Sequence, residues 1–156
     1  MKKSRTKLEK IISGGQTGVD RAALDVAIEL NITHGGWCPK GRKAEDGVIP
    51  AKYHLQETPS DRYSERTEWN VRDSDGTLII IKKPPPTGGT KLTIDKAMQL
   101  KKPCFIFDLS KEPQTDDFII WITTNNVRTL NVAGPRESQN PGIHDITCVV
   151  LRKLFG

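Results

Sequence analysis

Apolar residues along this chain fall into two kinds of pattern. Short continuous apolar runs, such as residues 77–81 and 103–108, are typical of strands buried on both faces of a sheet. Longer segments, such as residues 18–30, place apolar side chains three and four positions apart, which predicts a helix with one buried face. Because the two patterns alternate, the sequence predicts an α/β fold with a mostly parallel sheet and helices on both of its faces.

The boundaries of the elements follow from these patterns and from the turn residues between them. We expect strands at residues 9–13, 33–37, 54–57, 77–81, 103–108 and 129–133. We expect helices at residues 18–30, 63–73, 90–100, 116–125 and 141–154. The last helix is predicted to begin with Asn140 as its N-cap and Pro141 in its first turn. Four apolar side chains on this helix are expected to be buried: Ile143, Ile146, Val150 and Leu154.

The first predicted strand leads into a turn that holds Gly14, Gly15 and Gly18. Glycines let the backbone approach a ligand closely, and the N-terminus of the following helix offers N–H groups without partners. This combination favours an anion, most often a phosphate. The turn matches neither a P-loop, since no lysine follows Gly18, nor the dinucleotide fingerprint G-x-G-x-x-G. An alternative without a ligand stays open, because Thr17 and Asp20 have the spacing of a helix capping box.

In a parallel sheet the loops that follow the strands open at one edge, where α/β proteins commonly bind ligands. Those loops cover residues 14–18, 38–47, 82–90 and 133–138. Three of them combine glycine with threonine or serine, and three contain lysine or arginine. We therefore expect a rim of N–H groups, hydroxyls and cations that suits an oxyanion, with Arg136 as an anion ligand.

Several of these residues also fit roles that need no ligand. Lys40 and Arg42 fit an exposed, solvated face of the protein. Residues 87–90 fit a plain loop in which Thr90 is the N-cap of the next helix. Residues 74–76, Ser-Asp-Gly, fit a turn that ends a helix.

The helix predicted at residues 63–73 follows a cluster of polar and basic residues. Arg62, Arg66 and Asn70 are four positions apart, so they share one helix face if the helix begins that early. That face either reaches the rim or is simply exposed, and the sequence leaves both interpretations open.

The composition fits a globular protein of one domain. The chain has 156 residues, of which 35% are hydrophobic and 28% charged, so we expect one domain spanning residues 1–156 with a basic tail at 1–8. No apolar run is long enough to span a membrane, and no signal peptide is recognisable. The formal net charge of +5 suits an anionic ligand, but the basic residues are scattered and aromatic residues make up only 6%, which argues against nucleic acid.

Neither the cysteines nor the histidines form a recognisable catalytic or metal-binding pattern. The cysteines lack C-x-x-C spacing, which argues against a disulfide framework or a zinc site and favours a reducing, cytoplasmic location. Cys104 and Cys148 lie in apolar patterns typical of a core, whereas Cys38 lies in a polar loop and is either packed or a reactive thiol. We expect no catalytic residue and no metal ligand, since no triad or H-E-x-x-H spacing links the histidines. The histidines are His34, His54 and His144.

Four blocks of the sequence resemble the signatures of one protein family. They are residues 13–20 (SGGQTGVD), 36–47 (GWCPKGRKAEDG), 70–77 (NVRDSDGT) and 131–138 (NVAGPRES). On these blocks, which extend over most of the chain from Lys10 onward, the chain resembles the molybdenum (molybdenum-cofactor) carrier proteins. That family belongs to a Rossmann-like superfamily, which also contains nucleotide-binding sensors and the phosphoribohydrolases once labelled lysine decarboxylases.

The resemblance implies a Rossmann-like fold, a homo-oligomer, and a pterin-type ligand with a terminal phosphate, namely molybdenum cofactor (molybdopterin). The carrier would hold and protect this ligand, and a molybdoenzyme or a cofactor-synthesis protein would be its partner. Molybdenum would be held by the dithiolene of the cofactor, so no protein ligand to the metal is required. For the phosphate, residues 15–18 and 88–90 would supply N–H groups, and Arg42 and Arg136 would supply charge.

The ring edge of a pterin needs amide and carboxylate partners. Gln16, Asp75 and Glu137 would orient the ring, and Asn131 is also available for this role. Together with the phosphate ligands these residues define one predicted site. The full set of candidate ligand-binding residues is Gly14, Gly15, Gln16, Thr17, Gly18, Lys40, Arg42, Ser74, Asp75, Thr87, Gly88, Gly89, Thr90, Gly134, Arg136 and Glu137.

The alternatives to a carrier are an enzyme and a sensor. The related phosphoribohydrolases carry a P-G-G-x-G-T-x-x-E loop, whose glutamate and a neighbouring arginine serve cleavage of an N-glycosidic bond. In this chain the matching residues 87–95 lack the third glycine and the glutamate, and Asp95 falls at a different spacing. This departure favours binding over catalysis, while a nucleotide-binding sensor and a nucleoside-monophosphate phosphoribohydrolase stay open as alternatives.

Overall fold

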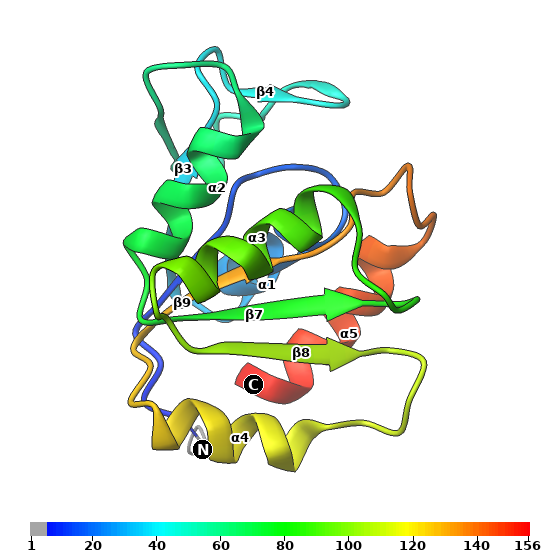
Figure 1. Cartoon of the computed structure of the whole chain (residues 1–156). Helices are drawn as coiled ribbons and strands as arrows, with labels where there is room; N and C mark the ends of the chain where they lie inside the picture. Colours follow the sequence, from blue (N-terminus) through cyan, green and yellow to red (C-terminus); the bar gives the residue numbers. More distant parts are fainter. Residues whose placement is uncertain (1–5) are drawn as a thin grey trace.

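A five-stranded sheet forms the centre of the protein (Figure 1), in a computed structural model that describes residues 6–156. Every neighbouring pair of strands in this sheet is parallel. The predicted α/β fold with a mostly parallel sheet is therefore confirmed, and the arrangement is Rossmann-like. The predicted tail at residues 1–8 lies largely outside the described residues. The strand order is β2 (Thr33–Gly35), β1 (Lys10–Ile12), β9 (Thr129–Ala133), β7 (Gly76–Ile81) and β8 (Cys104–Asp108).

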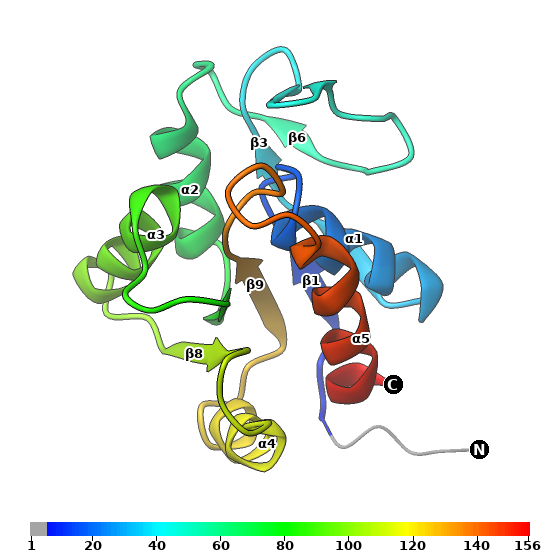
Figure 2. The same cartoon turned by 90° about the vertical axis from the view of Figure 1, so that its right-hand side faces the viewer.

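Helices cover both faces of the sheet. Figure 2 shows α1 and α5 on one side of the sheet and α2 and α3 on the other. Each helix predicted from the sequence is present, with ends that lie within two residues of the predicted ones. Among the described residues, no helix is long and apolar enough to cross a membrane. The helices are α1 (Val19–Glu29), α2 (Tyr63–Arg72), α3 (Gly88–Gln99), α4 (Thr115–Thr124) and α5 (Ile143–Phe155).

The main hydrophobic core lies between the sheet and the α1–α5 layer. The small side chains Ala22 and Ala23 are fully buried on α1 and allow this helix to pack closely. Phe118 of α4 is also fully buried, with its ring centroid 5.6 Å from that of Phe105 and 6.2 Å from that of Phe155. Strand β7 is buried at every position, as expected for a parallel strand covered on both faces.

A small arm, residues 36–60, follows the carboxyl end of β2 and lies at the top of Figure 1. It contains one pair of parallel strands and one antiparallel hairpin, each strand only two residues long. The predicted strand at 54–57 corresponds to one member of the parallel pair. The pair is β3 (Trp37–Cys38) with β6 (Gln56–Glu57), and the hairpin is β4 (Lys43–Ala44) with β5 (Gly47–Val48).

The arm has a hydrophobic cluster of its own, in which Cys38, Ile49 and Tyr53 pack against Leu24 of α1. The sequence predicted a loop at residues 38–47 and no strand between it and residue 54, so both the hairpin and this cluster were missed. Strands of two residues are too short to show a period, which is why the pattern of apolar positions gave no signal here.

Helix α5 does not begin where the sequence predicted. Its first residue is Ile143, and Gly142 before it has a φ of +91, in the left-handed region. The prediction of Asn140 as N-cap is therefore wrong. The carboxylate of Glu137 caps the helix instead, because it accepts the N–H groups of Gly142 at 2.5 Å and of His144 at 3.0 Å.

The buried face of α5 is also rotated relative to the prediction. Ile143 and Leu154 are buried as expected. Ile146 was wrongly predicted to be buried, since it is 40% exposed, and Val150 is only partly buried. Leu151 lies on the core face in their place, on the stripe that runs from Ile143 through Thr147.

Candidate ligand-binding site

A cavity of about 70 Å³ lies where the carboxyl ends of β1 and β9 meet the first turns of α2 and α3. These segments converge because the loops that follow parallel strands open at the same edge of the sheet. The residues around the cavity are mainly polar. They are Gly14, Gln16, Asp20, Tyr63, Arg66, Thr67, Asn70, Gly89, Thr90, Leu92, Thr93, Asn131, Ala133, Gly134, Arg136 and Gln139.

The glycines in the turn after β1 make room for atoms of the protein itself. A Cβ at Gly14 would lie 2.5 Å from Nη1 of Arg66, and a Cβ at Gly18 would collide with the carbonyl of Pro135. Gly18 also has a φ of +80, which other residues rarely adopt. The close approach that the sequence suggested for a ligand is therefore made by Arg66 and by the loop after β9. Gly14 lines the cavity, whereas Gly15 and Gly18 do not.

Thr17 and Asp20 do not form the capping box that their spacing suggested. Helix α1 has Gly18 as its N-cap and has no side-chain capping bond. The Thr17 hydroxyl instead donates to the carboxylate of Glu45 and accepts the N–H of Glu137 at 3.1 Å. Thr17 thus connects the turn to two other segments, while Asp20 faces the cavity.

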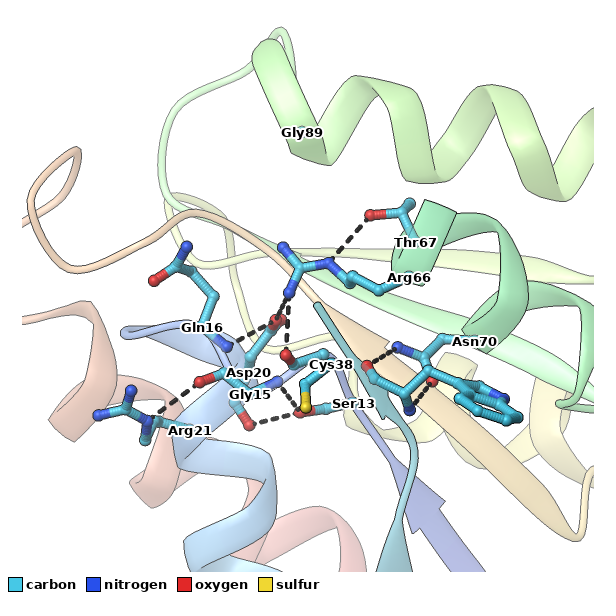
Figure 3. Close-up of polar contacts among 12 residues, drawn as sticks. Ser13, Gly15, Gln16, Asp20, Arg21, Cys38, Arg66, Thr67, Asn70 and Gly89 are labelled. Atoms are coloured by element: carbon cyan, nitrogen blue, oxygen red, sulfur yellow. Dashed lines mark hydrogen bonds and ion pairs between the residues drawn. The ribbon is translucent and has the colours of Figure 1, made fainter. Parts of the chain in front are cut away.

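A buried guanidinium and a buried carboxylate meet at the cavity (Figure 3). Nη1 of Arg66 lies 3.9 Å from Oδ2 of Asp20 and donates to the carbonyl of Gly14 at 2.9 Å. Nε of Arg66 donates to Oγ1 of Thr67 at 3.2 Å, whereas Nη2 makes no hydrogen bond with any described residue. Burial raises the pKa of Asp20 to about 6 despite the opposing charge of Arg66, and burial also lowers the pKa of Arg66.

Gln16 provides a second unused donor at the cavity. Its side chain is 5% exposed, and Oε1 accepts the N–H groups of Thr17 at 3.1 Å and of Glu45 at 2.8 Å. Because both partners of Oε1 are donors, the orientation of the amide is fixed. Nε2 then has no hydrogen-bond partner among the described residues. Leaving a buried polar group unpaired costs about 1–3 kcal/mol, so a ligand atom that accepts from Nε2 would be stabilised.

The first turn of α3 borders the same cavity. Gly89 and Thr90 line it, and Thr87, the N-cap of α3, makes no side-chain capping bond. Figure 3 shows Gly89 at the start of α3, on the side of the Arg66 guanidinium opposite to Asp20. The first N–H groups of a helix lack partners within the helix and carry the positive end of its dipole. An anion in the cavity would therefore be stabilised by α3 as well as by Arg66.

Three cations surround the ring of Tyr63 beside the cavity. The charged groups of Lys43, Arg66 and Arg136 lie 4.6, 5.1 and 5.4 Å from the ring centroid. Cations at these distances are attracted to an aromatic ring. Arg136, which the sequence predicted as an anion ligand, lines the cavity. The site therefore concentrates positive charge, which Asp20 balances in part beside Arg66 and Glu45 balances in part beside Arg136.

Glu45 connects the hairpin of the arm to the loops of the site. Its carboxylate accepts the hydroxyl of Ser138 at 2.6 Å, the N–H of Ser138 at 3.2 Å and the hydroxyl of Thr17, and it lies 3.9 Å from Arg136. Burial opposes ionisation of this group, but the hydrogen bonds from Ser138 and Thr17 outweigh it and lower the pKa of Glu45. An ionised Glu45 thus holds the arm beside the cavity.

Two of the predicted cations lie in the arm and do not line the cavity. Lys40 is exposed. The guanidinium of Arg42 serves the arm itself, because the carbonyls of its irregular segment lack partners in a sheet. Arg42 donates to the backbone carbonyls of Ile49, Pro50, Tyr53 and Leu55.

Ser74 and Asp75 lie at the opposite, amino edge of the sheet, because they precede β7 and do not follow a strand. The carboxylate of Asp75 accepts the N–H groups of Arg128 at 3.1 Å and of Thr129 at 2.9 Å. The hydroxyl of Ser74 donates to the carbonyl of Val71 at 3.0 Å. These residues form the helix-ending turn that the sequence left open as an alternative, and the structure does not bring them to the cavity.

The predicted site residues therefore fall into two groups. Glu137, expected to orient a ring, instead caps α5 through its carboxylate. The predicted residues that line the cavity are Gly14, Gln16, Gly89, Thr90, Gly134 and Arg136. Those that do not line it are Gly15, Thr17, Gly18, Lys40, Arg42, Ser74, Asp75, Thr87, Gly88 and Glu137.

Sequence reasoning left Arg66, Asp20 and Asn70 out of the set of site residues. Asn70 lines the cavity and also holds β3, since its side chain accepts the N–H of Trp37 at 2.8 Å and donates to the Trp37 carbonyl at 2.9 Å. The signal for Arg66 and Asn70 was their spacing of four along one helix face, which the structure shows to reach the rim. Asp20 had been interpreted as a helix cap only.

The cysteines and histidines lie outside the cavity. Cys38 is fully buried in the cluster of the arm, and burial raises the pKa of its thiol, which fits packing and not a reactive thiol. Cys148 is buried as predicted, whereas Cys104 is only partly buried. The imidazole of His144 bonds to Asp25 at 2.7 Å on the far side of α1. Within residues 6–156, no three His, Cys, Asp or Glu side chains are placed to hold a metal ion.

Comparisons with known proteins agree with the family resemblance found in the sequence. A family model described as the circularly permutated YpsA SLOG family matches residues 11–155. The structure is similar to a crystal structure from Syntrophus aciditrophicus SB described as that of a "putative molybdenum carrier protein". The two chains are 47% identical, the TM-score is 0.92, and the match covers 97% of each chain. No curated protein matches the chain at a significant level.

Proposed function

Since the chain belongs to the circularly permutated YpsA SLOG family, we propose that it binds a small phosphorylated ligand at the cavity and carries it without chemical change. One observation carries the proposal: Arg66, whose Nη2 is unused, and Gln16, whose Nε2 is unused, line one cavity together with the first turn of α3. A phosphate group offers acceptors to both donors and charge to the helix dipole.

The best candidate for this ligand is a phosphorylated pterin, namely molybdenum cofactor. The proposal is supported by the similarity to a protein named a molybdenum carrier and by donors that fit the phosphate of that cofactor. The dithiolene of the cofactor would hold the metal, so the chain itself needs no metal ligand. A homo-oligomer and a molybdoenzyme or cofactor-synthesis partner belong to the same proposal. The cytoplasm is the proposed compartment, since Cys38, Cys104 and Cys148 are all free thiols.

A second candidate function is cleavage of a nucleoside monophosphate, and one observation favours it. Asp95, the carboxylate near the position of the enzymes' glutamate, pairs with Lys91 at 3.1 Å and does not line the cavity. Asp20, however, is a carboxyl group inside the cavity next to Arg66, and its raised pKa is a property often found in catalytic acids. Asp20→Asn is therefore the variant that would remove such an activity.

The test is to identify the ligand that copurifies with the protein. Protein purified without oxygen is denatured, and the released material is analysed by mass spectrometry, absorbance and a molybdenum assay. A phosphorylated pterin with molybdenum supports the carrier. A bound nucleotide supports the sensor. The enzyme is supported if the protein is empty and hydrolyses nucleoside monophosphates while the Asp20→Asn variant does not.

A further inference from the structure

A second and larger cavity lies next to the first. Its volume is about 310 Å³, and it shares Thr90 and Gln139 with the smaller one. Proline rings form much of its wall, together with Ile81 at the end of β7. The other lining residues are Lys83, Pro84, Pro85, Pro86, Thr87, Pro135 and Asn140. We call the cavity of 70 Å³ the inner cavity and this one the outer cavity.

The two cavities differ in chemistry as well as in size. The inner cavity has a buried donor without an acceptor on Gln16, and Nη2 of Arg66 makes no hydrogen bond with a described residue. The guanidinium of Arg136 adds charge. The outer cavity combines proline rings with polar side chains, and its one charged side chain among the described residues is Lys83. A ligand with one anionic end and one ring system would match both cavities at once.

We propose that the two cavities divide one ligand between them: the inner cavity takes a tetrahedral oxyanion, such as a phosphate monoester end, and the outer cavity takes the attached ring. This inference rests on the proposed function in so far as the ligand is a phosphorylated small molecule. It changes the role of Gln16, which the sequence assigned to the ring and which here donates to the oxyanion.

Size supports this orientation. A cavity needs about 10–15 Å³ to hold one water molecule, so the inner cavity has room for a handful of non-hydrogen atoms. A tetrahedral oxyanion has five such atoms, whereas a fused ring system has many more. The outer cavity is the larger of the two.

Polarity supports the same orientation. A ring edge carries both donors and acceptors, but the free groups of Gln16, Arg66 and the first turn of α3 are all donors. An oxyanion accepts from every one of them, and hydrogen bonds to a charged acceptor are about twice as strong as neutral ones. Among the described residues that line the inner cavity, Asp20 is the one acidic group, and it already faces Arg66 at 3.9 Å.

The experiment compares two fragments of the ligand in the whole protein. Inorganic phosphate and a pterin without phosphate are titrated separately, and NMR follows the side-chain N–H signals of Gln16 and Arg66 and the backbone signals of residues 83–87. We expect phosphate to shift the Gln16 and Arg66 signals, and the pterin to shift residues 83–87. Shifts of Gln16 and Arg66 by the phosphate-free pterin would overturn the inference.

Two variants then separate the cavities. Gln16→Glu keeps the acceptor oxygen but replaces the free donor by charge, so phosphate affinity should fall at least about tenfold while pterin affinity stays within twofold. Thr87→Trp fills the outer cavity from an exposed position and should do the reverse. Gln56→Glu, the same change in a residue of the arm that lines neither cavity, is the matched control. Unchanged phosphate affinity in Gln16→Glu would overturn the inference.

A third titration, with molybdate, distinguishes the source of the oxyanion. Molybdate that binds at Gln16 at least tenfold more tightly than phosphate would identify a free oxyanion as the ligand of the inner cavity. The same titrations distinguish failure of the oxyanion site from failure of the proposed pterin carrier. If phosphate shifts Gln16 but no pterin binds, the inner oxyanion site stands and the pterin carrier fails.

Discussion

Arg42 in the arm and Arg66 at the inner cavity organise two adjacent regions in opposite ways. Arg42 uses all three nitrogens of its guanidinium on backbone carbonyls of the arm. Arg66 is the more buried of the two, yet it uses only Nη1 and Nε and leaves Nη2 without a partner among the described residues. A guanidinium whose donors are all satisfied stabilises a fold, whereas a buried one with a free donor retains the capacity to bind.

Of the variants that test this difference between Arg42 and Arg66, Arg66→Met should have the largest effect. Asp20 would then be buried without its cationic partner, and the loss of one member of a buried pair costs about 3–5 kcal/mol. We expect a free energy of unfolding lower by about that amount at pH 7.5, measured by urea denaturation, together with loss of phosphate binding. The double variant Arg66→Met/Asp20→Asn should recover most of the stability but not the binding. Phosphate binding by the double variant would contradict the role of Arg66.

The pH dependence of stability, compared between the wild-type protein and Asp20→Asn, tests the ionisation of Asp20 beside Arg66. The pKa of Asp20 is about 6 in the folded protein against an ordinary value of 3.8, while Arg66, Arg21 and Arg136 near it stay charged. The folded state therefore holds a proton that the unfolded state releases, and stability falls as the pH rises from about 4 to about 6. The loss is about 3 kcal/mol relative to Asp20→Asn. Urea denaturation of the wild-type protein and of Asp20→Asn across this pH range measures the loss. If the free energies of unfolding of the two proteins change with pH in the same way, Asp20 does not have the raised pKa.

Arg42→Met tests the other half of the comparison. It removes hydrogen bonds to backbone carbonyls of the arm, so we expect the free energy of unfolding to fall by about 2 kcal/mol. Phosphate affinity, measured by calorimetry, should stay within twofold. Arg62→Met, at an exposed arginine just before α2, is the matched control and should change stability by no more than about 0.5 kcal/mol. A large drop in phosphate affinity for Arg42→Met would show that Arg42 is a phosphate ligand, as the sequence predicted.

Glu45→Gln has the smallest expected effect. The carboxylate competes with a ligand anion for Arg136, 3.9 Å away, so its neutralisation should tighten phosphate binding about two- to fivefold at low salt. Stability should fall by at most about 1 kcal/mol. The gain in affinity should shrink when calorimetry is repeated at high salt. Glu112→Gln, an exposed carboxylate in the loop before α4, should leave both quantities unchanged.

Sequence patterns predicted the layers of this fold well because most of its helices and strands are long enough to show a regular pattern of apolar positions. Strand 129–133 was predicted with the bounds it has in the structure. The arm was missed because its strands are only two residues long and its order depends on contacts between distant residues, such as Asn70 with Trp37. Spacing along the chain carries no information about such contacts.

The candidate site was predicted in part, and the direction of the chain explains which part. Gln16 and Arg136 follow strands, so they lie at the carboxyl edge, where the inner cavity opens. Asp75 precedes a strand, and in a parallel sheet that places it at the amino edge. Arg66 comes from a helix, where spacing defines a face but not the direction in which that face points.

The pairing of β1 with β9 has a consequence for synthesis of the protein. The inner cavity needs both Gln16 and Arg136, and Arg136 is made well after Gln16 because most of the fold lies between them in the sequence. At about 5–20 residues per second, several seconds separate the two. Chains that stop before the loop after β9 lack part of the cavity wall. Ligand can therefore stabilise only chains that contain this loop, and products that terminate before it stay empty and open to proteolysis.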